Sequence, residues 1–427
     1  MEMKDLYQLF LGSKGASTDS RKVEKGQIYF ALKGENFDGN LFAQDALQAG
    51  ALAVVVDNAE LATQKQIIYV ENVLETLQQL ANYHRKQFQI PVIGITGSNG
   101  KTTTKELLQA VLSQKYHVIA TKGNFNNHIG VPLTLLQMNA SHEIAIIEMG
   151  ANHVHEIGFL CGICEPTFAV ITSIGIAHIG LFGSFEAIKE TKAELYKWVA
   201  QHQGKAFVNQ DLPILVEMAD RMQVKEQIEY GSHLKGGGYE FHFESADPFV
   251  KFRMGEQWVE TQLPGTYNYA NFITAATVGK YFKVPDSEIK SALEGYSSTN
   301  NRSQIVNKGS LTLILDAYNA NPSSMESALN NFKEMKSPQK GAILGGMREL
   351  GAYSAQEHQR IAEMAEALEL DFLVLVGDEF QEVKSAPHTL KFSNVEQVKL
   401  WWQKQELFDF LVLIKGSRHY CLEKILD

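Results

Sequence analysis

The sequence predicts an α/β protein with mostly parallel sheets, and two observations carry that prediction. Apolar, β-branched runs of strand length recur along the chain, and many are separated by stretches in which apolar residues have helical spacing. Strands that are apolar on both faces and alternate with helices are typical of parallel sheets covered by helices. The apolar runs are residues 92–96, 144–149, 169–174, 311–315, 342–344, 372–376 and 410–414, and the helical stretches include 101–114 and 355–368.

One segment departs from this alternation. Residues 239–262 alternate short aromatic and polar runs, which is typical of antiparallel strands. We therefore expect an antiparallel extension of a parallel sheet there.

Composition limits the classes of function. A length of 427 residues exceeds what one hydrophobic core usually fills, and 44% hydrophobic residues exclude a disordered chain. The net charge of −10 argues against a general nucleic-acid or membrane-surface binder, which needs an excess of Lys and Arg. Three cysteines make no disulfide framework and suit a reducing compartment. With no visible signal peptide and no apolar run of membrane-spanning length, we expect a cytoplasmic protein without membrane insertion.

Two polar segments predict domain boundaries. Residues 85–91 precede the first strongly apolar strand, and residues 295–301 precede a new series of strands. Three domains are therefore expected, at residues 1–88, 89–298 and 299–427.

The sharpest motif is a glycine-bearing loop that follows a β-branched strand and begins a helix. Gly97 and Gly100 allow backbone N–H groups to approach phosphate oxygens at a helix N-terminus, which favours anions. Lys101 is placed to reach the β- and γ-phosphates and Thr102 to hold Mg²⁺. The strict pattern has a glycine where this chain has Ile95. The loop predicts ATP or GTP binding, and the alternative is a glycine-rich turn that binds nothing.

Glu148 ends the apolar run 144–149, at the strand end where ligands gather in open α/β sheets. A carboxylate there is a suitable oxygen ligand for Mg²⁺, although a surface acid is the alternative.

Lys192 and His178 have both a functional and an ordinary interpretation. Lys192 falls within the apolar stripe formed by Phe185, Ile188, Leu195 and Val199, on a helix that begins after Ser184. An inward lysine tends to lose its proton and then can act as a base or take up CO₂ as a carbamate. On spacing alone, a lysine whose charged end reaches solvent is favoured, and a lone histidine such as His178 is more often structural.

Cys161 and Cys164 form a single C-x-x-C pair. Without a second ligand pair it is weak evidence for zinc, and it does not begin a helix after a strand as redox pairs do. We expect two small residues near the core.

Taken together, these motifs resemble the Mur ligases, the ATP-dependent amide-forming enzymes of peptidoglycan assembly. The matching segments are residues 94–103 (GITGSNGKTT), 147–151 (IEMGA), 177–178 (AH) before the Lys192 helix, and 265–271 (GTYNYAN). The family's own loop explains Ile95, and Tyr267 stands where a histidine is common. The resemblance implies a small N-terminal UDP-sugar-binding domain, a central phosphate-loop ATPase domain and a C-terminal Rossmann-like domain.

The resemblance also implies roles for individual residues. Lys101, Lys192 and His178 are expected to be catalytic, and two Mg²⁺ ions are expected, one on Thr102 and Glu148, the other on His178 and a carbamylated Lys192. ATP contacts are expected from Gly97, Ser98, Asn99, Gly100, Lys101, Thr102, Thr103, Asn268, Asn271, Arg302 and Asp316.

Residues 316–322 (DAYNANP) are similar to a signature of the last-acting family member, and the sequence lacks the Asp-Asn-Pro-Arg of the member that adds the third amino acid. The implied partners of a monomeric enzyme are UDP-MurNAc-tripeptide and D-Ala-D-Ala, and the third tripeptide residue is left open. The residues expected near the dipeptide are Tyr318, Asn319, Asn321, Lys415, Ser417 and Arg418. Further similar segments are 123–132, 346–351 and 415–418, with His128 and Gly346 where relatives have Asp.

The N-terminal segments 17–21 (STDSR) and 31–40 (ALKGENFDGN) resemble the UDP-sugar-binding module. The residues expected to contact the nucleotide sugar are Ser20, Arg21, Gly34, Asn36 and Asp38. Without the resemblance, an Asp-Ser cap and a polar glycine-rich turn would be favoured.

The polar groups that follow the C-terminal strands are Asp316, Gly345, Gly346, Gly377, Asp378 and residues 415–418, and we expect them to line one sheet edge that closes over the nucleotide. The alternatives to this ligase are the third-residue-adding ligase, a polyglutamate-adding relative, a phosphate-loop NTPase without ligase activity, and a nucleotide-binding module that has lost catalysis.

Overall fold

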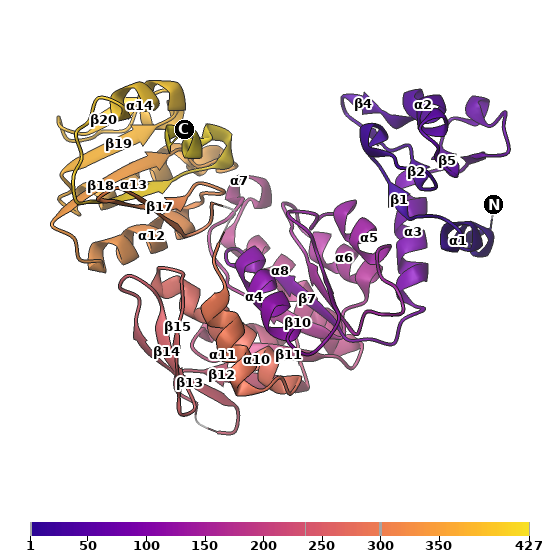
Figure 1. Ribbon diagram of the computed structural model, residues 1–427, viewed down its shortest axis with the longest axis horizontal. Helices are drawn as coiled ribbons and strands as arrows, with labels where there is room; N and C mark the ends of the chain where they lie inside the picture. The colour runs from indigo at the N-terminus through magenta and orange to yellow at the C-terminus, as the bar shows by residue number, and fades with distance from the viewer. Residues whose placement is uncertain (1, 235, 299–300, 427) are drawn as a thin grey trace.

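The computed structural model describes residues 2–234, 236–298 and 301–426, and these form three α/β domains (Figure 1). The N-terminal and C-terminal domains lie at opposite ends of the central domain, on the same side of it in this view. No helix in the described part of the chain is long and apolar enough to span a membrane.

The N-terminal domain is built on a parallel sheet. Its strand order is β1 (Ala16–Ser17), β2 (Ile28–Phe30), β5 (Ala53–Val56) and β6 (Ile67–Tyr69). The remaining elements are α1 (Met3–Leu11), α2 (Ala43–Gln48), α3 (Val73–Arg85) and the hairpin of β3 (Lys33–Gly34) and β4 (Phe37–Asp38).

The central domain contains a long sheet that is parallel over most of its width. In spatial order the strands are β15 (Gln257–Glu260), β14 (Lys251–Met254), β13 (Tyr239–Ser245), β12 (Glu226–Gly231), β11 (Lys205–Asn209), β10 (Phe168–Ile171), β7 (Val92–Thr96), β9 (Ile144–Glu148) and β8 (Val118–Ala120). The β13–β14–β15 portion is antiparallel, which confirms the extension predicted at 239–262. The helices are α4 (Lys101–Leu112), α5 (Gly130–Leu135), α6 (Glu156–Cys164), α7 (Ile179–Phe182), α8 (Phe185–Gln201), α9 (Pro213–Arg221), α10 (Thr266–Tyr281) and α11 (Asp286–Gly295).

The C-terminal domain has its own sheet, parallel except for the β16–β17 pair. In spatial order the strands are β16 (Gln304–Lys308), β17 (Leu311–Asp316), β21 (Phe410–Lys415), β18 (Gln339–Gly345), β19 (Phe372–Val376) and β20 (Leu390–Phe392). The helices are α12 (Pro322–Glu334), α13 (Ser354–Glu366) and α14 (Val395–Trp402). Because β17, β21, β18 and β19 are parallel neighbours, the polar groups that follow them share one sheet edge, as predicted.

Element boundaries differ slightly from the sequence expectations. The run 169–174 is a strand only to Ile171, and the helix expected to end at residue 114 ends at Leu112. At the predicted domain boundaries, α3 ends at Arg85 and β7 begins at Val92, while α11 ends at Gly295 and β16 begins at Gln304. Thr299 and Asn300, where the second boundary was predicted, lie outside the described residues.

Helix α3 joins the N-terminal domain to the central domain. It packs against α1 on one side and against α5 and α6 on the other (Figure 1). Arg85, the first residue of the polar segment predicted as a domain boundary, is buried and donates to the backbone oxygens of Phe88, Cys164 and Glu165. Burial lowers the pKa of this guanidinium, so its hydrogen bonds replace the water it has lost.

Arg85→Met is expected to lower the free energy of unfolding by about 3 kcal/mol, because it removes charge-assisted hydrogen bonds and leaves buried carbonyls unpaired. Urea denaturation followed by fluorescence measures this change. The matched control is Lys86→Met, since Lys86 is more exposed and its ion pair with Glu165 is worth less than about 1 kcal/mol. If the two substitutions lowered the free energy of unfolding equally, the buried hydrogen bonds of Arg85 would not stabilise the protein as expected.

Candidate active site

The loop between β7 and α4 requires its glycines for steric reasons. Gly97 has φ +147°, and a Cβ there would lie 2.1 Å from Thr172 Oγ1. Gly100 has φ +82°, in the left-handed region, and a Cβ there would lie 2.5 Å from Asn271 Oδ1. The loop therefore presents bare backbone at the N-terminus of α4, which is the arrangement that binds phosphate groups.

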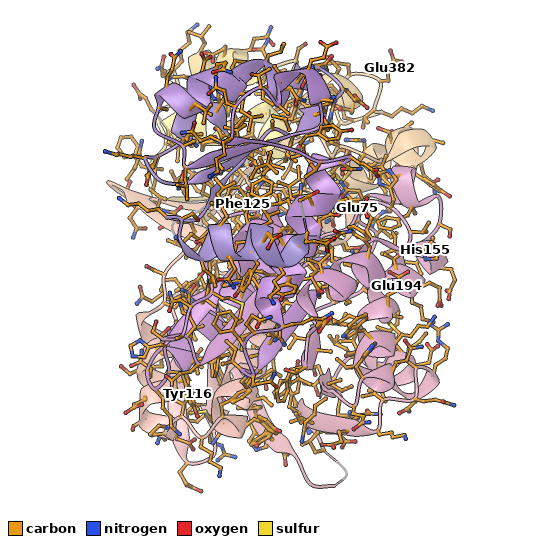
Figure 2. All side chains as sticks on the ribbon, turned by 90° about the vertical axis from the view of Figure 1, so that its right-hand side faces the viewer. Glu75, Tyr116, Phe125, His155, Glu194 and Glu382 are labelled. Atoms are coloured by element: carbon orange, nitrogen blue, oxygen red, sulfur yellow. The ribbon has the colours of Figure 1, made fainter. Side chains whose placement is uncertain are left out.

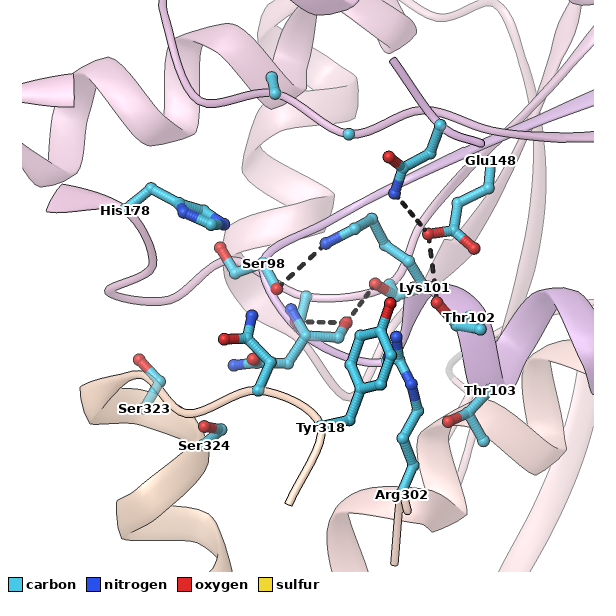
Figure 3. A pocket seen from close by; sticks show the side chains of 18 of the residues that line it. Ser98, Lys101, Thr102, Thr103, Glu148, His178, Arg302, Tyr318, Ser323 and Ser324 are labelled. Carbon is cyan, nitrogen blue, oxygen red and sulfur yellow. Dashed lines mark hydrogen bonds between the residues drawn. The ribbon is translucent and has the colours of Figure 1, made fainter. Parts of the chain in front are cut away.

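Lys101 begins α4 and folds back over the loop. Its Nζ donates to the carbonyl oxygens of Gly97 and Ser98 at 2.7 and 3.2 Å. Figure 3 shows the contact with Ser98. Burial lowers the pKa of Lys101 to about 8, with Glu148 opposing this shift and Arg302 adding to it. Its ammonium is therefore held at the loop by backbone oxygens.

Glu148 lies at the end of β9, beside the loop, and is almost completely buried. Its Oε1 accepts from Thr102 Oγ1 at 3.2 Å and from Asn126 Nδ2 at 2.9 Å (Figure 3). Its Oε2 is buried without a hydrogen-bond partner among the described residues, and Lys105 Nζ lies 4.0 Å away. A buried carboxylate oxygen with free coordination capacity, next to a threonine hydroxyl, fits a Mg²⁺ ligand.

Lys192 lies on the inner side of α8 and is 3% exposed, so the interpretation of a solvent-reaching lysine is wrong. Its Nζ lies 5.6 Å from the centroid of the Phe182 ring. Burial, followed by the charge of Lys101, lowers the pKa of Lys192 to about 7. The lowered pKa favours the free amine, which is the form that takes up CO₂.

The rest of α8 explains how Lys192 is held. Ser184 accepts from the backbone N–H of Ala187 and caps the helix, as predicted, but Phe185 is 40% exposed and does not belong to the buried stripe. Glu194 accepts from the backbone N–H of Gly158 in the first turn of α6, and it pairs with His155 on the surface (Figure 2). This contact fixes α8 against α6 from the solvent side.

His178 precedes α7 with a left-handed φ of +56°, and its ring Nδ1 contacts the carboxylate of Glu349 from the C-terminal domain. His178 lines the same cavity as the phosphate loop. Within the described ranges, no three His, Cys, Asp or Glu side chains gather as a metal cluster. A cation here would thus need Lys192 as a carbamate, or a substrate oxygen, to complete its ligands.

A cavity of about 930 Å³ lies between the central and C-terminal domains. Of the residues predicted to contact ATP, Gly97 does not line it, whereas the others do: Ser98, Asn99, Gly100, Lys101, Thr102, Thr103, Asn268, Asn271, Arg302 and Asp316. Lys192 does not line the cavity either. Residues of the phosphate loop and residues of the C-terminal domain therefore line the same cavity.

Tyr318 lies in this cavity next to arginine side chains. The Arg302 guanidinium carbon is 3.8 Å from the ring centroid, and that of Arg418 is 5.5 Å away. Figure 3 shows Tyr318 and Arg302 side by side near Lys101. Arg302 Nε is buried without a hydrogen-bond partner in the described chain, and its guanidinium makes a cation–π contact with the Tyr318 ring.

Two C-terminal residues that were predicted to contact different ligands contact each other. Asp316 was assigned to ATP and Lys415 to the dipeptide, but Lys415 Nζ donates to Asp316 Oδ2 at 2.5 Å and is 2% exposed. The two form one ion pair, because β17 and β21 place them opposite each other. Asn321 caps α12 and donates to Asn99 Oδ1 at 2.8 Å, which ties the C-terminal domain to the phosphate loop. In the part of the cavity lining that is described, Tyr318, Asn319 and Lys415 are present, whereas Asn321, Ser417 and Arg418 are not.

Asn268 and Asn271 lie beneath the phosphate loop. Asn271 Oδ1 accepts from Thr104 Oγ1, and Asn271 Nδ2 donates to Asn268 Oδ1 at 2.9 Å. Asn268 in turn donates to the carbonyl oxygen of Pro264. This chain of hydrogen bonds supports the loop from α10.

The N-terminal candidates are separate from this cavity, and none of them is among its described lining residues. Arg21 makes a two-pronged contact with Asp19, whose side chain also caps the 3₁₀ turn Ser20–Lys22. Asp38 caps the turn Gly39–Phe42 and accepts from Asn40. The caps that the alternative interpretation expects are therefore present. Gly34 and Asn36 are exposed.

Cys161 and Cys164 are both buried, as predicted. Their sulfur atoms lie 4.0 and 3.8 Å from Met149 Sδ, and burial raises the pKa of the Cys164 thiol to about 12. They are core residues.

Sequence reasoning missed Lys105, Asn126 and Glu349. Lys105 is one helical turn after Lys101, so its position on the loop helix was a usable signal. Asn126 and Glu349 lie within the similar segments 123–132 and 346–351, but nothing in those segments shows that Asn126 contacts Glu148 or that Glu349 contacts His178.

Comparison with known proteins identifies the class. Family models match residues 13–85 (Mur ligase family, catalytic domain), 95–279 (Mur ligase middle domain) and 301–418 (Mur ligase, glutamate ligase domain). The chain belongs to the Mur ligase family.

Individual members are similar over nearly the whole chain. The UDP-N-acetylmuramoyl-tripeptide–D-alanyl-D-alanine ligase of Treponema pallidum is 33% identical, over 97% of this chain and 93% of the relative. The crystal structure of MurF from Acinetobacter baumannii is 30% identical with a TM-score of 0.88, covering 99% of this chain and 97% of that one. MurF from Thermotoga maritima in complex with ADP is 27% identical with a TM-score of 0.85, covering 98% and 97%.

Proposed function

We propose that the protein is an ATP-dependent ligase that joins D-Ala-D-Ala to UDP-MurNAc-tripeptide. The observation that carries the proposal is the shared cavity, in which the phosphate loop faces the Tyr318 segment of the C-terminal domain. Resemblance of residues 316–322 to the last-acting family member, and the D-alanyl-D-alanine ligases among its relatives, support the choice of amine.

The reaction must convert a poor leaving oxygen into a good one. The terminal carboxylate of the tripeptide attacks the γ-phosphorus of ATP, ADP leaves, and an acyl phosphate forms. The dipeptide ammonium loses a proton to solvent, its amine attacks the acyl carbon, inorganic phosphate leaves, and the new amide nitrogen releases a second proton. Positioning and charge neutralisation are the main tasks, because two anions must approach in the first step.

The chain's own residues position the reactants and neutralise their charge. Loop N–H groups and Lys101 bind the β- and γ-phosphates, and Arg302, held against Tyr318, adds positive charge on the C-terminal side. Thr102 and Glu148 would hold one Mg²⁺, and His178 with carbamylated Lys192 a second. When bound, these ions would supply charge neutralisation at the γ-phosphate and the activated carboxylate.

The N-terminal domain is proposed to bind the UDP-sugar part of the substrate. Ser20, Arg21, Gly34, Asn36 and Asp38 lie in its loops and caps. Because they are separate from the cavity, the substrate would extend from one domain to the other, with its peptide reaching the phosphate loop.

An amine competition tests the proposal. The protein is incubated with ATP and UDP-MurNAc-tripeptide or the shorter dipeptide precursor, and phosphate release is measured with D-Ala-D-Ala, lysine or meso-diaminopimelate. Release that requires both the tripeptide and D-Ala-D-Ala is expected. Release with a diamino acid but not D-Ala-D-Ala would identify the third-residue-adding ligase, and release independent of both substrates would identify a plain NTPase.

A further inference from the structure

The contact between α7 and the 3₁₀ turn η4 (Gly351–Tyr353) joins two unusual backbone segments. His178 and Glu349 are both non-glycine residues in the left-handed region, with φ of +56° and +63°. Such backbone is costly and persists where surrounding contacts hold it. Here His178, in the central domain, is in contact with the C-terminal domain, and Glu349, in the C-terminal domain, is in contact with the central domain.

The backbones at this contact are packed too closely for side chains. The Gly180 N–H donates to the carbonyl oxygen of Glu349 at 2.9 Å. A Cβ on Gly180 would lie 2.5 Å from the backbone nitrogen of Gly351. Ile179 and Leu350, on either side, are buried, so the docked arrangement is specific.

The side chains of His178 and Glu349 meet at this contact. His178 Nδ1 meets the Glu349 carboxylate, and a carboxylate only accepts, so Nδ1 carries the proton. This leaves Nε2 as the ring nitrogen that can offer a lone pair, and His178 lines the cavity that the phosphate loop shares. Figure 3 shows His178 on the far side of this cavity from Arg302.

We propose that Glu349 is a positioning residue that sets the orientation and tautomer of His178 only when the C-terminal domain is docked. The inference deepens the proposed function, since it rests on His178 acting at the γ-phosphate. If Glu349 has this role, the site in the central domain is complete only when the C-terminal domain is docked against it. A histidine ligand commonly has such a carboxylate on its second nitrogen, but here that carboxylate comes from across a domain boundary.

Glu349→Ala is the main variant and Glu349→Gln the conservative one, because an amide oxygen still accepts from Nδ1. The matched control is Glu326→Ala: Glu326 is similarly exposed, at 46% against 43% for Glu349, and it pairs with Arg360 within the C-terminal domain. ADP affinity, measured by calorimetry, monitors the phosphate loop independently of ligation.

We expect Glu349→Ala to lower kcat about 10- to 100-fold, with ADP affinity unchanged and partial recovery in Glu349→Gln. The ¹⁵N spectrum of histidine-labelled protein, with His178 assigned from His178→Asn, should change from the Nδ1–H form to a mixture of tautomers. In a His178→Ala background, Glu349→Ala should have no further effect on kcat. Glu326→Ala should behave as wild type.

An unchanged kcat or an unchanged His178 tautomer in Glu349→Ala would overturn the inference, as would a full additional loss in the His178→Ala background. If the wild-type protein ligates no amine, the proposed function fails, and the tautomer spectrum still decides whether Glu349 orients His178.

Discussion

Lys192→Ala is expected to lower kcat for ligation about 10²- to 10³-fold while ATP remains bound. The side chain is 3% exposed, and its Nζ lies near Phe182 with a pKa lowered to about 7, so its free amine is available for carbamate formation. In the proposed function, carbamylated Lys192 would hold a Mg²⁺ ion that supplies charge neutralisation at the γ-phosphate, and losing one preorganised group of this kind costs about 10²- to 10³-fold in kcat. Phosphate release and ADP calorimetry measure the two properties separately.

The control is Lys189→Ala on the same helix. Lys189 is also nearly buried, but its Nζ is paired with Glu217 at 3.0 Å, so its loss should leave kcat within about twofold. Recovery of Lys192→Ala by added formate or acetate would support the carbamate, since these ions replace its carboxylate. Near-normal turnover without added carboxylate would show that Lys192 has no part in catalysis.

Gly100→Ala is expected to lower kcat/KM for ATP about 100-fold, because the loop must shift away from the phosphates. The new Cβ would lie 2.5 Å from Asn271 Oδ1 at φ +82°, and Asn271 is itself bonded to Thr104 and Asn268. Asn271 therefore has little freedom to move away from the new Cβ.

Gly255→Ala is the control for backbone strain alone. Gly255 also has a left-handed φ, of +59°, but a Cβ there meets nothing within 4 Å. It should cost about 1 kcal/mol of stability and leave ATP kinetics unchanged. A Gly100→Ala enzyme with wild-type KM and kcat would contradict the steric account of the loop.

The fold was largely predictable because its signals are local. Alternation of apolar strands and helices gave the α/β class, and parallel neighbours then placed Asp316 and Lys415 at one sheet edge. The loop residues Gly97–Lys101 were recognisable because a strand, a glycine pair and a helix follow directly in sequence.

What remained hidden depends on tertiary contacts. Lys192 on a helical stripe is compatible with burial or with solvent, and only packing of α8 against α6 decides between them. The pairing of Asp316 with Lys415 and of His178 with Glu349 joins segments 99 and 171 residues apart, a separation at which local sequence carries no information. The burial of Arg85, in the polar segment predicted as a domain boundary, could not be predicted because a polar residue gives no sign that backbone carbonyls will surround it.

Transfer of oxygen from the tripeptide carboxylate to phosphate tests the central claim most directly. UDP-MurNAc-tripeptide labelled with ¹⁸O in its terminal carboxylate is incubated with ATP and D-Ala-D-Ala, and the inorganic phosphate is examined by mass spectrometry. An acyl phosphate predicts one ¹⁸O atom per phosphate, because attack by the amine breaks the bond between the acyl carbon and that oxygen. Phosphate without label would show that this cavity hydrolyses ATP without activating the peptide.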